Sequence, residues 1–98
     1  MLKLNILKVG GAVVEDDAAL DAFIGRFSAL DGLNLLVHGG GRTACDLASR
    51  LGIQTVMVGG RRVTDADTLK LVTSVYAGLV NKNIVAKLQG AGVKSFGI

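Results

Sequence analysis

Apolar residues in the first forty positions form two short continuous runs that flank a helical pattern. The runs extend from Leu2 to Val9 and from Leu33 to His38, and apolar runs of this length are typical of strands in a parallel sheet. Between them, the acidic cluster Glu15-Asp16-Asp17 predicts the start of a helix extending to about Ala29, since carboxylates are favoured at helix N-termini. Its apolar positions recur at helical spacing and should face the sheet: Leu20, Phe23, Ile24 and Phe27. A β-helix-β unit with parallel strands is therefore predicted.

The middle of the chain predicts a second helix followed by a hairpin. The helix should extend from about Thr43 to Leu51 and stop at Gly52. Its expected buried positions are Ala44, Leu47, Ala48 and Leu51. Two β-prone segments follow, Ile53 to Val58 and Arg62 to Thr64, and Gly59-Gly60 between them suits the positive φ angles of a tight hairpin turn.

A long third helix is predicted from Asp65 to Gln89, with Thr64 as its N-cap. One expected apolar face consists of Leu69, Val72, Tyr76, Leu79 and Val80, and the apolar surface is widened by Leu71, Val75 and Val85. A helix that is apolar over more than one face needs two partners. The sheet is one of them, and a neighbouring subunit is a candidate for the other.

The last six residues, 93–98, predict another strand, and no turn or polar tail follows it. A parallel sheet that ended there would leave apolar surface and an unpaired edge exposed. We therefore expect the chain to be part of a longer protein.

Composition is that of a single globular domain of 98 residues. Half of the residues are apolar, 19% are charged and the mean hydropathy is +0.50. Disordered chains combine low hydrophobicity with high charge, so this composition predicts a folded chain. No apolar run reaches the roughly 20 residues of a membrane span, and no signal peptide is recognisable, so a cytoplasmic location and no membrane partner are expected. The single cysteine, Cys45, cannot form an intramolecular disulfide.

The positive charge of the chain does not indicate a nucleic-acid partner. The formal net charge is +3, but eleven basic residues are scattered among eight acidic ones, and the aromatic residues are few and dispersed. Proteins that bind nucleic acid usually combine a basic patch with stacking aromatics. Small anionic ligands remain plausible.

Two glycine-rich turns form the most informative motif of the chain. Lys8-Val9-Gly10-Gly11 and Val37-His38-Gly39-Gly40-Gly41 each follow a predicted strand, so both should lie at the carboxyl edge of the sheet, where ligands bind. Glycine allows backbone N–H groups to approach oxygen atoms, and the helix that follows adds its positive end. The turns predict an anion site, although neither has the spacing of the phosphate loop or of the dinucleotide motif. The alternative for each turn is tight packing between strand and helix.

Several side chains near these turns are candidates for chemistry. Lys8 could neutralise charge on a transferring phosphoryl group. Arg62 could hold a carboxylate bidentately, and its neighbour Arg61 is the rival, although strand alternation places the two on opposite faces. His38 is more often a hydrogen-bonded structural residue than a base in such a position. Cys45 should pack on its helix, and no spacing predicts a metal site.

Four segments together resemble the amino acid kinase family, and within it the N-acetylglutamate kinases of arginine biosynthesis. They are Lys8-Val9-Gly10-Gly11, Val37-His38-Gly39-Gly40-Gly41, the stretch Gly60-Arg61-Arg62-Val63-Thr64-Asp65-Ala66-Asp67-Thr68-Leu69, and Gly78-Leu79-Val80-Asn81-Lys82-Asn83-Ile84-Val85. The resemblance covers essentially the whole chain but only about the first third to two-fifths of a typical member. Aspartate kinases usually continue the first motif with a serine or threonine pair, whereas Ala12-Val13 follows here.

The resemblance implies an α/β fold, the N-terminal part of a three-layer α-β-α sandwich with a mainly parallel sheet. Residues 1–98 would be the amino-acid-substrate-binding portion, and the C-terminal ATP-binding portion would be absent. The implied reaction transfers the γ-phosphoryl group of ATP, with Mg²⁺, to the side-chain carboxylate of N-acetyl- or N-succinylglutamate. The chain alone should have little or no kinase activity.

The resemblance also implies a role for each motif residue. Lys8 would be catalytic, stabilising the phosphoryl group in transfer. Arg62 would hold the substrate α-carboxylate from a hairpin that acts as a lid. Backbone groups would bind phosphate at Gly10, Gly11 and Gly39 and substrate at Gly40 and Gly41. The helix 65–89 would contribute to a homodimer.

One departure from the family pattern concerns the substrate. Arg42 stands where many members have proline, which adds charge beside the acyl end of the substrate and leaves the acetyl and succinyl alternatives open. Two other functions compete for the isolated chain. It could be a non-catalytic ligand-binding or regulatory module that keeps the anion site, or a dimerisation unit built on the third helix.

Overall fold

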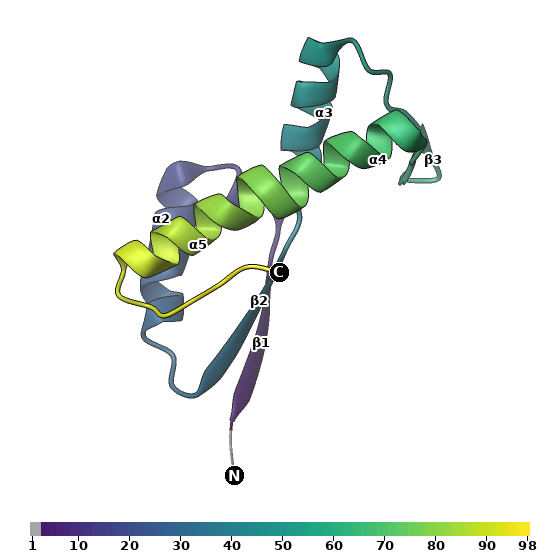
Figure 1. Cartoon of the computed structure of the whole chain (residues 1–98). Coiled ribbons are helices and arrows are strands. Elements are labelled where there is room, and N and C mark those ends of the chain that lie inside the picture. The colour runs from purple at the N-terminus through teal and green to yellow at the C-terminus, as the bar shows by residue number, and fades with distance from the viewer. Residues whose placement is uncertain (1–2) are drawn as a thin grey trace.

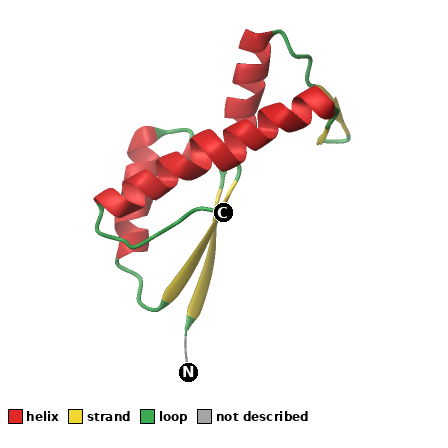
Figure 2. Ribbon diagram, viewed as in Figure 1, coloured by secondary structure: helices red, strands yellow, loops and turns green. Residues whose placement is uncertain are grey.

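A parallel pair of strands forms the base of the structure, a computed structural model that describes residues 3–98 (Figures 1 and 2). Strand β1 (Leu4–Val9) pairs with β2 (Leu33–His38), with Leu4 opposite Leu33 and Val9 opposite His38. The predicted parallel unit is confirmed, and Leu2, the expected first residue of β1, lies outside the described residues. Both strands end at the same edge, each followed at once by its glycines.

Two helices, rather than the single predicted one, connect these strands. Helix α1 (Gly11–Val14) begins within the first glycine turn, because the carbonyl of Gly10 accepts the amides of Val13 and Val14 at 3.1 and 3.0 Å. Helix α2 (Asp17–Ser28) begins after Asp16, whose carboxylate accepts the Ala19 amide at 3.0 Å. The acidic cluster therefore starts a helix as predicted, but Glu15 belongs to the end of α1.

Gly32 turns the chain into β2 and is required there. Its φ is +84°, and a Cβ at this position would lie 2.7 Å from the backbone oxygen of Lys3, which accepts the Leu33 amide. Gly32→Ala should therefore lower the free energy of unfolding by about 1–3 kcal/mol. Urea unfolding followed by circular dichroism measures the change.

Gly25→Ala is the matched control for this prediction. Gly25 lies within α2, and a Cβ there would have no atom of residues 3–98 within 4 Å. Alanine is the better helix former, so this variant should be more stable than the parent by about 0.5–1 kcal/mol. A similar loss of stability in both variants would contradict the left-handed turn at Gly32.

Helix α3 (Gly41–Leu51) follows β2 and ends at Gly52, whose φ is +72°. It begins two residues before the predicted start at Thr43, because the glycine turn itself provides the first residue of the helix. Ala44 and Ala48 are fully buried, but Leu51 is 60% exposed. The expected burial of Leu51 is wrong, because the end of α3 projects away from the other helices (Figure 1).

A short hairpin follows, formed by β3 (Val56–Val58) and β4 (Arg61–Val63). Gly59 and Gly60 have φ angles of +57° and +77°, so the predicted glycine turn is confirmed. The strands are shorter than predicted. Arg61 is exposed and Arg62 is half-buried, in agreement with the predicted alternation.

The long third helix is present over residues 66–90, in three consecutive segments. They are α4 (Ala66–Thr73), the π-helical η1 (Ser74–Val80) and α5 (Asn81–Gly90). The N-cap is Asp65 rather than Thr64: its carboxylate accepts the Thr68 amide at 2.8 Å, and this bond lowers the pKa of Asp65. No helix within residues 3–98 combines the length and the apolar character needed to cross a membrane.

The π-helical segment changes which face of the long helix is buried. The buried residues are Thr68, Leu71, Val75, Val80, Ile84 and Leu88. The interval of five residues between Val75 and Val80 coincides with the π turn, which adds a residue to the helical repeat. Leu69 and Leu79 are 55% and 60% exposed, so these two members of the expected apolar face lie outside the core formed with Val80.

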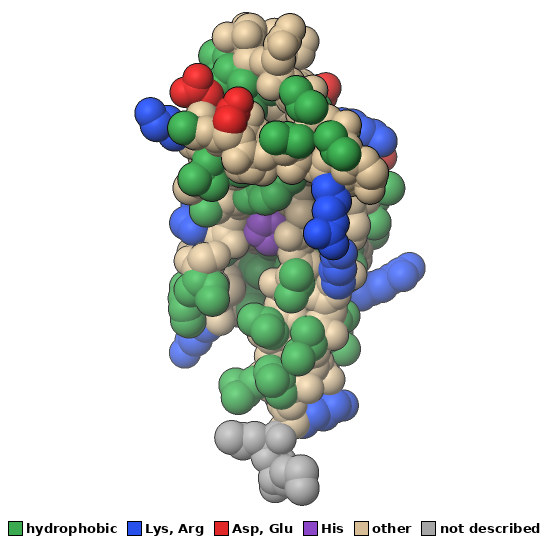
Figure 3. All heavy atoms as spheres, turned by 90° about the vertical axis from the view of Figure 1, so that its right-hand side faces the viewer, with side chains coloured by type: hydrophobic (Ala, Val, Ile, Leu, Met, Phe, Trp, Pro, Cys, Tyr) green, Lys and Arg blue, Asp and Glu red, His purple; other side chains and the backbone are tan. Residues whose placement is uncertain are grey.

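One face of the parallel sheet carries the core, and the other is uncovered within residues 3–98. Helix α2 packs against α5 and is joined to it by an Asp21–Lys87 ion pair of 2.6 Å. On the uncovered face, apolar side chains with exposed fractions of 44–65% gather over the sheet (Figure 3): Leu4, Ile6, Leu33, Leu35 and Val37. The structure therefore shows an α/β arrangement with a parallel sheet but not the third layer of the expected sandwich.

The C-terminal residues 93–98 do not form the predicted strand. Side chains of the long helix bind their carbonyls instead: Gln89 donates to Ser95 at 3.0 Å and Asn81 to Ile98 at 3.4 Å. Phe96 and Ile98 are 86% and 93% exposed. This segment returns along the long helix towards β2 (Figure 1) without pairing to either strand of the sheet.

Candidate functional site

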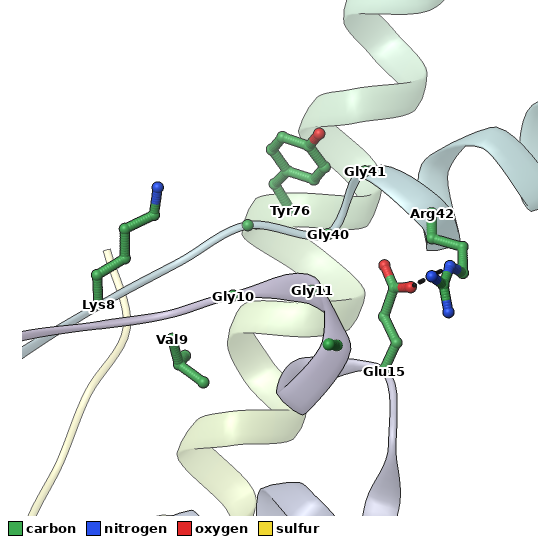
Figure 4. Close-up of a pocket in the computed structure, with 11 residues that line it drawn as sticks. Lys8, Val9, Gly10, Gly11, Glu15, Gly40, Gly41, Arg42 and Tyr76 are labelled. Atoms are coloured by element: carbon green, nitrogen blue, oxygen red, sulfur yellow. Dashed lines mark ion pairs between the residues drawn. The ribbon is translucent and has the colours of Figure 1, made fainter.

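A pocket of about 350 Å³ lies where β1 and β2 end, and both glycine turns line it (Figure 4). Its wall consists of Lys8, Val9, Gly10, Gly11, Ala12, Glu15, Gly39, Gly40, Gly41, Arg42 and Tyr76. The parallel register places both turns at one edge, as the sequence predicts. The turns therefore enclose a single site.

Lys8 supplies a positive charge to the first turn. Its side chain is exposed and lines the pocket. Among residues 3–98, the two ion pairs are Arg42–Glu15 and Lys87–Asp21, and neither involves Lys8. The ammonium group is therefore available to a ligand, and the chemistry it suits is neutralisation of an anion.

Gly40 is glycine because the long helix packs tightly against the second turn. A Cβ on Gly40 would lie 3.1 Å from Cγ2 of Val80 and 3.2 Å from Cδ1 of Tyr76. By contrast, a Cβ on Gly10 or Gly39 would have no neighbour within 4 Å in the described part of the chain. Tight packing thus explains Gly40, whereas the protein itself leaves open space at Gly10 and Gly39.

His38 ties the second turn to the long helix. Its Nδ1 lies 2.8 Å from the carbonyl oxygen of Gly39, and its Nε2 lies 3.1 Å from Nδ2 of Asn81. A neutral ring with its proton on Nδ1 satisfies both contacts, donating to the carbonyl and accepting from the amide. Both ring nitrogens are engaged, which agrees with the structural role favoured for His38.

Arg62 reaches the start of α3 from the hairpin. Its Nη2 donates to the Gly41 carbonyl at 3.1 Å and lies 3.2 Å from Sγ of Cys45, a half-buried free thiol. Arg62 is not part of the pocket wall. The bond to the Gly41 carbonyl nevertheless places its guanidinium next to Gly41, which lines the pocket. Its Nε is buried and has no acceptor within residues 3–98. The structure thus brings Arg62 beside the second turn, whereas Arg61 is exposed.

Sequence reasoning missed Glu15 as a residue of the site. Its Oε1 accepts the Thr43 amide of α3 at 3.0 Å, and its Oε2 lies 3.4 Å from Nε of Arg42. The side chain of Glu15 is 9% exposed, against 74% for Arg42. No local pattern could have revealed the contact, because Glu15 and Thr43 are 28 residues apart.

Tyr76 is the second residue that sequence reasoning assigned only to the core. It projects from η1 over the second turn (Figure 4), and its hydroxyl would lie 3.6 Å from a Cβ on Gly41. The signal available in the sequence was a hydroxyl-bearing side chain within an otherwise apolar helical pattern.

The geometry suits an anionic ligand. A lysine side chain and the N-terminal amides of two helices surround the pocket, and such groups bind carboxylate and phosphoryl oxygens. Within the described part of the chain, no three side chains of histidine, cysteine, aspartate or glutamate form a candidate metal cluster.

Comparison with known sequences agrees with this geometry. The amino acid kinase family model matches residues 3–98. An acetylglutamate kinase of Phocaeicola vulgatus is 59% identical over 98% of the chain, and those of Bacteroides fragilis and Cytophaga hutchinsonii are 56% and 51% identical over 98% and 100% of it. The chain spans 37% of the length of each of these relatives.

A solved structure has the same fold over nearly the whole chain. The crystal structure of smu.665 from Streptococcus mutans superposes with a TM-score of 0.78 at 28% identity, covering 95% of this chain and 38% of that one. The sequence match, the shared fold and the pocket between the two glycine turns lead to one conclusion: the chain belongs to the amino acid kinase family.

Proposed function

We propose that this chain supplies the amino-acid-substrate side of an acetylglutamate kinase. The observation that carries the proposal is the single pocket formed by Lys8 and both glycine turns in a chain 59% identical to such an enzyme. In the proposed reaction, a side-chain carboxylate oxygen of N-acetyl- or N-succinylglutamate forms a bond to the γ-phosphorus of ATP. The bond from that phosphorus to the β,γ-bridging oxygen breaks, giving an acyl phosphate and ADP.

The proposed roles divide the pocket between its two turns. The phosphoryl group would face Lys8 and the backbone of Gly10, Gly11 and Gly39. The amino acid substrate would lie against Gly40 and Gly41, and Arg62 would bind its α-carboxylate. This last role requires the guanidinium to turn from the Gly41 carbonyl towards the ligand, and its unpartnered Nε provides a further donor.

ATP would be the co-substrate, and Mg²⁺ would arrive on its phosphates. Mg²⁺ is usually held by substrate phosphates and one or two carboxylates. Residues 3–98 contain no cluster of candidate metal ligands, so we assign no step on this chain to the ion.

The remainder of the three-layer sandwich would pack on the exposed face of the sheet. The apolar side chains on this face are Leu4, Ile6, Leu33, Leu35 and Val37. We place the ATP-binding portion in that remainder, because the relatives continue well beyond the matched region. We also propose a homodimer through the long helix, on which Leu69 and Leu79 are 55% and 60% exposed.

A fusion protein tests the proposed function. The chain is joined to the C-terminal remainder of the Phocaeicola vulgatus relative and incubated with ATP, Mg²⁺ and N-acetyl- or N-succinyl-L-glutamate. Hydroxylamine traps an acyl phosphate as a coloured hydroxamate. We expect hydroxamate from the fusion protein and none from either part alone.

Two controls make the result decisive. The intact Phocaeicola vulgatus enzyme shows that the assay works, and circular dichroism shows that the fusion protein is folded. A folded fusion protein that forms no hydroxamate would overturn the proposal. If it bound N-acetylglutamate without turnover, the chain would be a non-catalytic ligand-binding module.

A further inference from the structure

Within residues 3–98, Glu15 forms the one side-chain hydrogen bond that joins the helices following the two glycine turns. It closes α1, donating its amide to the Gly11 carbonyl at 2.9 Å, so it is one helical turn from the first glycine pair. Its carboxylate accepts the amide of Thr43, in the first turn of α3. A Cβ on Gly11 would lie 3.8 Å from the same Oε1. The side chain therefore lies between the two halves of the pocket.

The carboxylate of Glu15 is buried and only partly paired. Only 9% of the side chain is exposed, and Oε2 is buried with no hydrogen-bond donor among the described residues. Arg42 lies 3.4 Å away but is largely exposed, so it offsets only part of the charge. Burying a group that is only partly paired is unfavourable, so the hydrogen bond from the Thr43 amide contributes to holding the side chain in this position.

The contact also limits where a ligand can bind at α3. The amides of Gly41, Arg42 and Thr43 lie in the first turn of the helix, where backbone donors have no partner within the helix. The Glu15 carboxylate already accepts the hydrogen bond of the Thr43 amide. An anionic ligand is therefore left with the amides next to Gly40, on the side of α3 that lines the pocket.

We propose that Glu15 is a positioning residue that fixes the spacing between the two glycine turns and directs the anionic substrate to the amides of Gly41 and Arg42. This inference rests on the proposed function, because the spacing matters for a transfer between groups bound at the two turns. Misplacement of reacting groups by a small distance lowers turnover strongly. Glu15 acts through α3 and does not itself touch the reacting atoms.

The kinetic test compares Glu15→Ala with Glu15→Gln in the fusion protein. Glu15→Ala removes the acceptor for Thr43 and should lower kcat about 10- to 100-fold, with a smaller change in the KM for ATP. Glu15→Gln keeps an acceptor oxygen and should restore most of the lost kcat. Equal kcat in Glu15→Ala and the parent, or equal loss in both variants, would overturn the inference.

Asp16→Ala is the matched control. Asp16 also caps a helix through a backbone amide, that of Ala19 at 3.0 Å, but it is exposed and outside the pocket wall. Its replacement should lower the Tm by an amount comparable to Glu15→Ala while leaving kcat unchanged. A parallel loss of kcat in Asp16→Ala would show that general destabilisation explains both variants, contrary to the inference.

A second measurement on the 98-residue chain separates this inference from the proposed function. Amide hydrogen exchange followed by NMR should accelerate severalfold at Thr43 in Glu15→Ala but not in Asp16→Ala, whether or not the fusion protein has kinase activity. Unchanged exchange at Thr43 would overturn the positioning role. An inactive parent fusion protein with accelerated exchange would overturn only the kinase assignment.

Discussion

Replacing Lys8 with alanine in the fusion protein is expected to lower kcat by about 100- to 1,000-fold, the usual effect of removing one group that stabilises transition-state charge. The ammonium group lines the pocket beside the first glycine turn and has no carboxylate partner among residues 3–98. Its charge is therefore available to oxygens on the transferring phosphorus. Steady-state kinetics with N-acetylglutamate and ATP measure the change.

The distribution of the effect between kcat and KM identifies the role of Lys8. Stabilisation of the transition state alone predicts a fall in kcat with little change in either KM. Lys3→Ala is the control, because Lys3 is also exposed but lies at the opposite end of β1, and this variant should match the parent. A raised KM with unchanged kcat would reassign Lys8 to ground-state binding.

Arg62→Lys should raise the KM for N-acetylglutamate about 10- to 100-fold, because a lysine keeps the charge but loses the planar fork that binds a carboxylate bidentately. In the described structure, one nitrogen of the fork holds the Gly41 carbonyl. Lysine can replace that single bond, so the second turn should keep its shape. Calorimetric titration with N-acetylglutamate measures the binding directly.

The neighbouring arginine provides the control for this substitution. Arg61 is exposed on the opposite face of β4, and Arg61→Lys should leave the affinity unchanged. If affinity fell in Arg61→Lys and not in Arg62→Lys, the carboxylate-binding role would belong to Arg61. Equal affinity in both variants and the parent would remove that role from the hairpin.

Local sequence signals predicted the parts of this structure that depend on neighbouring residues. Continuous apolar runs predicted both strands of the sheet, and Gly59-Gly60 predicted the hairpin turn through its positive φ angles. The length of the third helix was also predicted. Its N-cap was misplaced by one residue, because both Thr64 and Asp65 are residues that favour this position.

A regular helical repeat could not predict which positions of the long helix are buried. A period of 3.6 residues groups Leu69, Tyr76 and Leu79 with Val80, but the π turn advances the buried positions by one residue after Val75. This turn allows Val80 to contact Gly40 while the next segment continues along α2. Packing against two separate surfaces, rather than propensity, decides the register.

The sequence by itself determined the two glycine turns, their place after parallel strands and the presence of Lys8 beside the first, because each depends on residues adjacent in the chain. Only the tertiary structure decided that Glu15 bonds to α3, that Arg62 lies against Gly41 and that Tyr76 overlies the second turn. These contacts join residues far apart in sequence, and no periodicity specifies them. They arise because parallel pairing brings both strand ends to one edge, where helix termini and side chains from three elements meet.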